Sequence, residues 1–309
     1  MKKLFLCKPR GFCAGVVRAI DTVEKALSIW GAPIYVKHQI VHNRHVVEEL
    51  ERKGAVFIED LTEVPIGARV IYSAHGIPPE VRVLAKQREL IEIDATCGLV
   101  TRVHSAAKRF AEKGYKILLI GHRNHVEIIG TAGEAPEVTT IIESIDDVNK
   151  LNFSSEEKLF YITQTTLSLD DVKEITDALQ LKYPQIETLP SSSICYATTN
   201  RQLALSEITP LVDLVLIVGD PTSSNSNRLC EVAKKRGIDA YLINAADEIN
   251  PTWIERVEAI GLSAGASTPE KIVQECIELL QTLGISQIEE IEYTQENVFF
   301  QLPREILSS

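Results

Sequence analysis

The sequence predicts an α/β protein made of three similar lobes, each with a parallel sheet. Apolar runs rich in β-branched residues alternate with segments of helical periodicity along the whole chain, as in parallel sheets joined by crossover helices. The runs 115–121 and 213–219 are apolar almost throughout, which indicates strands covered on both faces. Three cysteines recur at similar intervals, each between a strand-like run and a helix. These patterns favour three units over the roughly two domains expected from length alone.

Each expected element follows from its local pattern. Strands are expected where β-branched and aromatic residues form short runs, and helices where apolar residues recur every three or four positions. In chain order, the expected strands are 3–7, 33–37, 55–59, 69–74, 90–94, 115–121, 138–143, 159–163, 185–189, 213–219, 240–244 and 258–263. The clearest helices are 15–30, 99–114, 168–184, 226–237 and 268–284.

The repeat is built around Cys13, Cys97 and Cys195, which are 84 and 98 residues apart. A polar cluster follows each cysteine after 28 or 29 residues, at the end of a strong strand, and a second cluster follows a later strand. The first clusters contain His42, His125 and Ser223, and the second contain His75, Thr165 and Ser267. Open α/β sheets bind ligands beyond the carboxyl ends of their strands. We therefore expect a pseudo-threefold arrangement that brings the cysteines together inside a ring of polar side chains.

The cysteines also suggest where the lobes begin and end. We expect a first lobe over 14–96, a second over 97–194 and a third over 195–284, which the N-terminal strand 1–13 joins. The segment 285–309 is expected to be a C-terminal tail that closes the fold.

Three thiolates at one centre indicate a metal site. Their spacing matches neither the closely spaced pairs of zinc fingers nor the compact cysteine run of ferredoxins. Soft thiolate ligands select iron–sulfur clusters, zinc or Cu(I). A cubane cluster normally takes four cysteines, so three would leave one iron open to a substrate and to Lewis-acid chemistry. The other cysteines, Cys7 in a strand and Cys230 and Cys276 on helices, are expected to be structural.

The polar clusters indicate a phosphorylated ligand. The run SSNSNR, residues 223–228, begins a helix, where free N–H groups and the helix dipole favour phosphate. SAHGIPPEV likewise places His75 before a helix that can begin at a proline. Glu127 lies two residues after His125 and becomes a proton source if burial raises its pKa, with Thr165 as a relay.

Composition excludes several classes of partner. The chain has 32 basic and 43 acidic residues, a net charge of −11, whereas nucleic-acid binding needs a basic footprint. The apolar run at 4–7 is too short for a signal peptide, and no run approaches the ~20 apolar residues of a membrane span. We therefore expect a cytoplasmic protein with reduced thiols, no membrane or nucleic-acid partner and, without an apolar stripe, a monomer.

The motifs resemble those of the 4-hydroxy-3-methylbut-2-enyl diphosphate reductase (LytB) family. They occur in the family's order over residues 4–284: PRGFCAGVVRAI, IVHN, SAHG, DATC, GHRNHVEIIGTAGE, TQTTLS, ICYATTNRQ, SSNSNRL and AGAST. The ending ENVFFQLP, residues 296–303, looks like the family's closing strand. The resemblance implies a three-lobed α/β fold around one [4Fe-4S] cluster per chain. It also implies reductive removal of a hydroxyl group from an allylic diphosphate, which yields isopentenyl and dimethylallyl diphosphates.

The resemblance implies a role for each matching residue. Cys13, Cys97 and Cys195 would ligate three irons, and the substrate hydroxyl would bind the fourth. Glu127, Thr165 and His125 would be catalytic, with Glu127 and Thr165 delivering the proton. The substrate would be held by His42, His75, His125, Thr165, Ser223, Ser224, Asn225 and Ser267.

Two positions depart from the family pattern. Gly98 follows the second cysteine where proline is usual, and Val17 replaces an acidic residue.

The family's electron donor would be flavodoxin or ferredoxin. Both are acidic proteins, so we expect a local basic docking site that includes Lys8 and Arg10. Two alternatives share part of this pattern: quinolinate synthase, also a three-lobed protein with three cysteines on a [4Fe-4S] cluster, and a non-catalytic iron–sulfur sensor or scaffold. The diphosphate-binding set and Glu127 favour the reductase.

Overall fold

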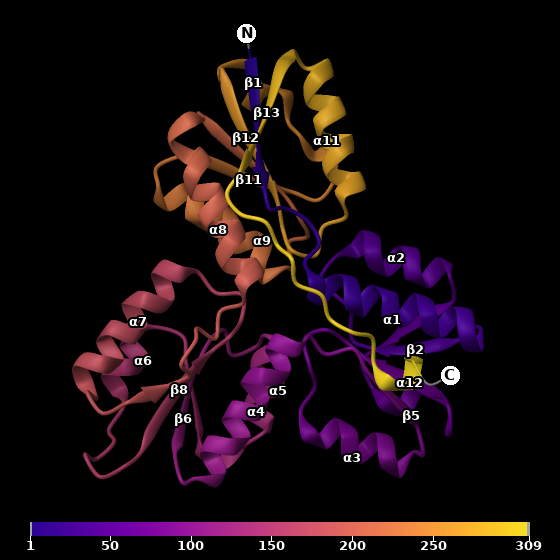
Figure 1. Cartoon of the computed structure of the whole chain (residues 1–309), viewed down its shortest axis with the longest axis vertical. Coiled ribbons are helices and arrows are strands. Elements are labelled where there is room, and N and C mark those ends of the chain that lie inside the picture. The colour runs from indigo at the N-terminus through magenta and orange to yellow at the C-terminus, as the bar shows by residue number, and fades with distance from the viewer. Residues whose placement is uncertain (1, 308–309) are drawn as a thin grey trace. The chain divides into compact units, whose positions relative to one another are not determined.

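Three parallel sheets organise the chain, whose computed structural model describes residues 2–307 (Figure 1). The chain forms two compact units. The first contains the chain up to Val17, the segment His42–Val46 and Tyr196–Phe299. The second contains Arg18–Val41, Val47–Cys195 and the chain from Phe300. The predicted α/β fold with parallel sheets is therefore confirmed.

The first unit holds a five-stranded sheet of order β11-β10-β12-β1-β13. Its strands are β1 (Lys2–Lys8), β10 (Leu214–Val218), β11 (Asp239–Ile243), β12 (Ala259–Ala264) and β13 (Ile285–Glu292). Its helices are α8 (Tyr196–Ile208), α9 (Ser224–Lys235), α10 (Pro251–Glu255) and α11 (Glu270–Thr282), with single 3-10 turns at Thr209–Leu211 and Ala246–Glu248. One core packs Leu4 and Leu216 against α11, and a second packs Phe5 against α8 and α9, so both faces of the sheet are covered.

The second unit holds two four-stranded sheets, of order β3-β2-β4-β5 and β7-β6-β8-β9. The strands are β2 (Ile34–Lys37), β3 (Ala55–Ile58), β4 (Arg69–Tyr72), β5 (Ile91–Asp94), β6 (Lys116–Ile120), β7 (Thr139–Ile142), β8 (Leu159–Thr163) and β9 (Glu187–Thr188). The helices are α3 (Pro79–Gln87), α4 (Gly98–Glu112), α5 (Val126–Gly133), α6 (Ile145–Lys150), α7 (Leu169–Lys182) and α12 (Arg304–Leu307), and 3-10 turns lie at Leu61–Glu63 and Pro136–Val138. Helices α1 (Ala14–Trp30) and α2 (Arg44–Arg52) each begin in the first unit and continue in the second.

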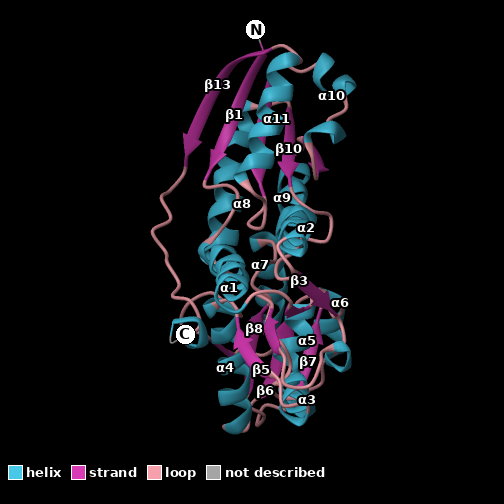
Figure 2. Ribbon diagram, turned by 90° about the vertical axis from the view of Figure 1, so that its right-hand side faces the viewer, coloured by secondary structure: helices cyan, strands magenta, loops and turns pink. Residues whose placement is uncertain are grey.

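Every strand expected from an apolar run is present, although β9 is only two residues long. The expected closing strand at 296–303 is wrong, because that segment has no regular structure before α12. The strand that completes the sheet is β13, which lies beside β1 and runs in the same direction (Figure 2). Apart from Ile288, its exposed residues are charged or polar, as suits the edge of a sheet. That polarity hid β13 from a search for apolar runs.

The lobe boundaries expected from the cysteines stay a prediction. The three sheets draw on residues 34–94, on residues 116–188, and on the two ends of the chain together with 214–264. No helix in the described part of the chain is long and apolar enough to cross a membrane.

Candidate active site

Each of the three repeated cysteines stands directly before a helix. Cys13 precedes α1, Cys97 is the N-cap residue of α4, and Cys195 precedes α8. All three are partly exposed. A helix N-terminus stabilises a thiolate, which is the form that binds metal.

The other three cysteines are buried, as predicted. Burial raises the pKa of Cys7, Cys230 and Cys276 to about 12, so their thiols stay protonated and inert. Accessibility therefore separates the two groups of cysteines in the same way as the repeat does.

Backbone hydrogen bonds tie each cysteine to the second polar cluster of another repeat. The Cys97 N–H donates to Ala74 O at 3.0 Å, next to His75, and the Cys195 N–H donates to Thr165 O at 3.0 Å. The Cys13 N–H donates to Ala266 O at 3.2 Å, next to Ser267. The predicted polar residues thus lie beside the cysteines.

In the second unit, Glu127 is bound by Thr165. The Thr165 N–H donates to Glu127 Oε1 at 2.6 Å, and Thr165 Oγ1 donates to Oε2 at 3.1 Å. The Glu127 side chain is 2% exposed. Burial outweighs these hydrogen bonds and raises the pKa of Glu127 to about 7. The carboxyl group is thus poised to gain or lose a proton near neutral pH.

His125 connects Glu127 to a group of histidines. It caps α5, and its Nδ1 accepts the Glu127 N–H at 3.2 Å. Its ring meets the His75 ring edge to face, with centroids 6.3 Å apart. His75, His125, Glu127 and Thr165 lie in the same compact unit as Cys97 and Cys195, and their predicted roles in binding and catalysis stay a prediction.

Small residues let the His75 loop approach α5. A Cβ at Gly76, whose φ is +80°, would lie 3.0 Å from the His104 ring, and one at Gly130 of α5 would lie 3.1 Å from it. His104 is buried, and its Nδ1 lies 3.0 Å from Glu134 Oε1. His104 therefore fills the space between the loop and the helix.

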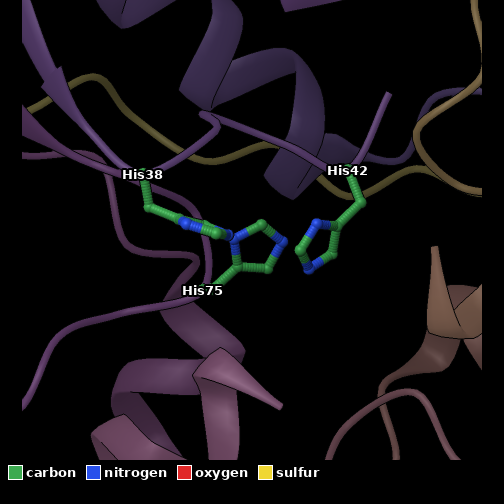
Figure 3. Close-up of side chains that lie close together, drawn as sticks. All are labelled: His38, His42 and His75. Atoms are coloured by element: carbon green, nitrogen blue, oxygen red, sulfur yellow. The ribbon is translucent and has the colours of Figure 1, made fainter. Parts of the chain in front are cut away.

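His38 is a residue that the sequence prediction missed. Its ring meets His75 edge to face, with centroids 5.9 Å apart (Figure 3). Its Nδ1 lies 2.8 Å from Glu59 Oε1, and its φ of 62° is unusual for a residue with a side chain. The one weak sign in the sequence that His38 belongs to the site is its position directly after a strand.

The first unit gathers the remaining predicted residues. Ser223 caps α9 by accepting the Ser226 N–H at 3.3 Å, and Ser224 is the first residue of that helix. Asn225 Oδ1 accepts the Ala266 N–H at 2.9 Å, and Ser267 Oγ donates to His42 O at 2.8 Å. Cys13, His42, Ser223, Ser224, Asn225 and Ser267 thus belong to one unit. Ser223, Ser224 and Asn225 lie at the N-terminus of α9, a position that favours an anion.

Lys8 and Arg10, the residues expected in a basic docking site, are both paired with acidic side chains, and the docking site stays a prediction. Lys8 pairs with Glu290 at 3.5 Å and Glu292 at 3.1 Å. Arg10 pairs with Glu270 at 2.7 Å and with Glu290 at 2.8 Å. Acidic side chains, two of them from the strand that the sequence search missed, neutralise both cations.

Comparison with known proteins decides the family. The family model described as LytB protein matches residues 4–281, most of the chain. The chain belongs to the LytB protein family. This LytB chain is 71% identical to a 4-hydroxy-3-methylbut-2-enyl diphosphate reductase of Protochlamydia amoebophila (strain UWE25), over 99% of this chain and 98% of that protein. It is 62% identical to the protein of the same name from Chlamydia pneumoniae, over the full length of both.

Solved structures support the same assignment. A reductase from Plasmodium falciparum, titled E-1-hydroxy-2-methyl-but-2-enyl-4-diphosphate reductase, has a TM-score of 0.98 and 49% identity, covering 99% of this chain and 97% of its own. A second structure, titled (E)-4-hydroxy-3-methyl-but-2-enyl diphosphate reductase, the terminal enzyme of the non-mevalonate pathway, has a TM-score of 0.65 and 31% identity. That match covers 91% of this LytB chain and all of the other.

Proposed function

We propose that this chain reduces (E)-4-hydroxy-3-methylbut-2-enyl diphosphate to isopentenyl and dimethylallyl diphosphates, the last step of the methylerythritol phosphate route to isoprenoids. The observation that carries the proposal is the buried Glu127, held by Thr165 next to the Cys195 loop. A carboxyl group with a pKa of about 7 is suited to protonate a leaving hydroxyl at neutral pH. The names of the relatives agree with this reaction.

The donor set fits one [4Fe-4S] cluster per chain. Three partly exposed thiols stand at helix N-termini, whereas the three buried thiols are unsuited to metal binding. Cys13, Cys97 and Cys195 would hold the cluster. When bound, it would supply electrons and an iron site for the substrate hydroxyl.

The diphosphate is proposed to bind the histidines and the N-terminal end of α9. Ser223, Ser224 and Asn225 lie in the first turn of that helix or at its cap, where N–H groups and the dipole favour negative charge. The protein's net charge of −11 means that this anion must be held by local geometry rather than by the overall field. The proposed substrate-binding set is His42, His75, His125, Thr165, Ser223, Ser224, Asn225 and Ser267.

The proton's location follows from the hydrogen bonds to Glu127. The Thr165 N–H must donate, so Oε1 stays an acceptor and the proton of the neutral acid resides on Oε2. Oε2 faces Thr165 Oγ1, a hydroxyl that can accept this proton and pass its own onward. The substrate hydroxyl leaves as water when it receives that proton. An electron pair added to the substrate leaves an allyl anion, and a proton at either end of it gives one of the two products.

An anaerobic turnover assay tests the proposal. Reconstituted protein is mixed with the hydroxylated diphosphate and dithionite, and the products are identified by mass spectrometry. We expect both isoprenyl diphosphates, and none from a matched Cys97→Ser sample. A cluster-replete sample that forms neither product would overturn the proposed function.

In the cell we propose that the enzyme is a cytoplasmic monomer that receives electrons from flavodoxin or ferredoxin. Reduced thiols are maintained in that compartment. Because Lys8 and Arg10 are already paired, the donor is proposed to dock elsewhere on the surface.

A further inference from the structure

Three arginines occupy equivalent places in the three repeats. Arg18, Arg102 and Arg201 follow Cys13, Cys97 and Cys195 by five, five and six residues. They lie on α1, α4 and α8, the helices that begin at the cysteines. The proposed reaction assigns them no role.

Arg18 binds the loop that leads to Cys97 rather than its own cysteine. Its Nη1 donates to Thr96 O at 3.0 Å, and its Nη2 donates to Asp94 O at 3.1 Å. Thr96 is the residue directly before Cys97. The guanidinium therefore supports the Cys97 loop by hydrogen bonds to two of its carbonyl oxygens.

Arg102 binds the loop that leads to Cys195. Its Nη1 donates to Ser191 Oγ at 2.9 Å, and its Nη2 donates to Ser192 O. Ser192 Oγ in turn accepts the Ile194 N–H at 3.1 Å, which shapes the turn directly before the cysteine. Arg18 and Arg102, each five residues after a cysteine, thus both bind the loop that precedes the next cysteine.

Arg201 binds the loop that leads to Cys13. Its Nη2 and Nε both donate to Gly11 O, at 2.7 and 3.2 Å. Gly11 lies two residues before Cys13 and has a φ of +66°. A Cβ on Gly11 would lie 3.2 Å from Thr268 O, which is closer than an ordinary contact. Arg201 is fully buried, and Glu296 balances its charge at 3.0 Å. This loop is therefore held by a buried arginine whose charge is balanced by a partly buried glutamate.

We propose that Arg18, Arg102 and Arg201 are positioning residues, each of which holds the loop of the next metal-binding cysteine. The first repeat supports the second, the second supports the third, and the third supports the first. Each contact lies within one compact unit. The rigid, planar guanidinium of arginine fixes the directions of its N–H donors, whereas the flexible lysine ammonium does not. The role in metal binding rests on the proposed function, whereas the placement of the thiols is a property of the polypeptide itself.

A purely structural role predicts a different pattern. An arginine that only stabilises its own helix would disturb the cysteine at the start of that helix, or would lower the stability of the whole chain. The proposed arrangement instead transfers each effect to a cysteine about 80 to 190 residues away in the sequence. Rates of thiol modification resolved by residue separate these outcomes.

The test uses the full-length apoprotein, prepared anaerobically and treated with iodoacetamide, with modification of each cysteine followed by mass spectrometry. Arg18→Met should raise the rate at Cys97, and Arg102→Met the rate at Cys195, by about threefold or more, since a loop loses hydrogen bonds to a charged group. Arg201→Lys, which keeps a cation beside Glu296, should raise the rate at Cys13. In each variant the other two rates should stay at the wild-type value.

Arg109→Met is the matched control, because Arg109 lies exposed on the same helix as Arg102 and faces the Phe110 ring. Melting temperatures show whether each variant folds. Acceleration at the cysteine of the same helix, equal acceleration at all three, or no acceleration would overturn the inference. If Arg201→Lys does not fold, the rates in the Arg18 and Arg102 variants decide.

Two combined outcomes keep this inference apart from the proposed function. If the thiol pattern is found but wild-type protein forms no isoprenyl diphosphate, the arginine arrangement stands and the proposed reaction fails. If product is formed but the pattern is missing, the reaction stands and the arginine arrangement fails. A second readout is iron release from reconstituted protein into a chelator, which should be faster in all three variants than in Arg109→Met.

Discussion

Glu127 holds a proton near neutral pH because burial outweighs the two hydrogen bonds that favour its charged form. Thr165 contributes to two parts of the site at once, since its carbonyl accepts the Cys195 N–H while its N–H and hydroxyl bind Glu127. At the scale of single residues, Thr165 therefore both binds the proposed acid Glu127 and helps to place Cys195.

Replacing Glu127 by Gln should lower turnover by about 10²–10⁴-fold, the usual contribution of a general acid. The amide keeps the shape of the side chain but has no acidic proton to deliver, so binding of the diphosphate should change little. Turnover and substrate affinity are measured separately on reconstituted protein. Glu137→Gln, the same change at an exposed position outside the proposed site, is the control. Unchanged turnover in Glu127→Gln would remove the assigned role.

The raised pKa of Glu127 also predicts a pH-dependent stability of the apoprotein. Below pH 4.5 the carboxyl group is protonated in both the folded and the unfolded chain, so it contributes no difference. As pH rises through 4.5 toward about 7, the unfolded chain releases this proton first, and the free energy of unfolding falls. Relative to Glu127→Gln, the wild-type protein should lose up to about 3 kcal/mol across this range. Denaturation at several pH values measures the difference, and parallel curves for the two proteins would contradict the assigned pKa.

At the scale of elements, the N-termini of α1, α4 and α8 present the three partly exposed cysteines. The turn after Cys97 also contacts the C-terminal segment. A Cβ on Gly98 would lie 3.3 Å from the Phe300 ring, which is tighter than an ordinary contact. Glycine, in place of the usual proline, therefore leaves room for the aromatic ring that packs against this position.

Val17, the other departure from the family pattern, is 39% exposed, and nothing in the structure explains it.

The packing of Phe300 against Gly98 predicts that the two residues are energetically coupled. Gly98→Ala should stabilise a Phe300→Leu protein by about 0.4–1 kcal/mol, because alanine restricts the unfolded chain. In the wild-type background the gain should be smaller, since the new methyl group meets the ring. A double-mutant cycle on unfolding free energies measures the coupling. Equal effects of Gly98→Ala in the two backgrounds would show that the ring does not constrain this turn.

Much of the fold could be predicted because buried parallel strands leave apolar runs, as at β6 and β10. The edge strand β13 could not, since its charged side chains conceal it. The three cysteines and their polar clusters could be found in the sequence because they recur at similar intervals. His38 and the three loop-binding arginines were not assigned a role, because each acts on groups that only the folded chain brings near, such as Glu59 or Gly11 O.

At the scale of the whole molecule, the proposed reaction draws unequally on the three repeats. The first unit carries Cys13 and the N-terminus of α9, and the second carries Cys97, Cys195 and Glu127, the proposed proton donor. The central claim is that the three partly exposed cysteines hold one cluster, whereas the three buried ones have no part in it.

Iron and sulfide content per chain, measured on anaerobically reconstituted protein, tests this claim most directly. We predict about four irons and four sulfides in the wild-type protein and in Cys230→Ala. Cys13→Ser, Cys97→Ser and Cys195→Ser should each hold far less. Full iron and sulfide in any of these three serine variants, or the loss of both in Cys230→Ala while its fold is retained, would contradict the account.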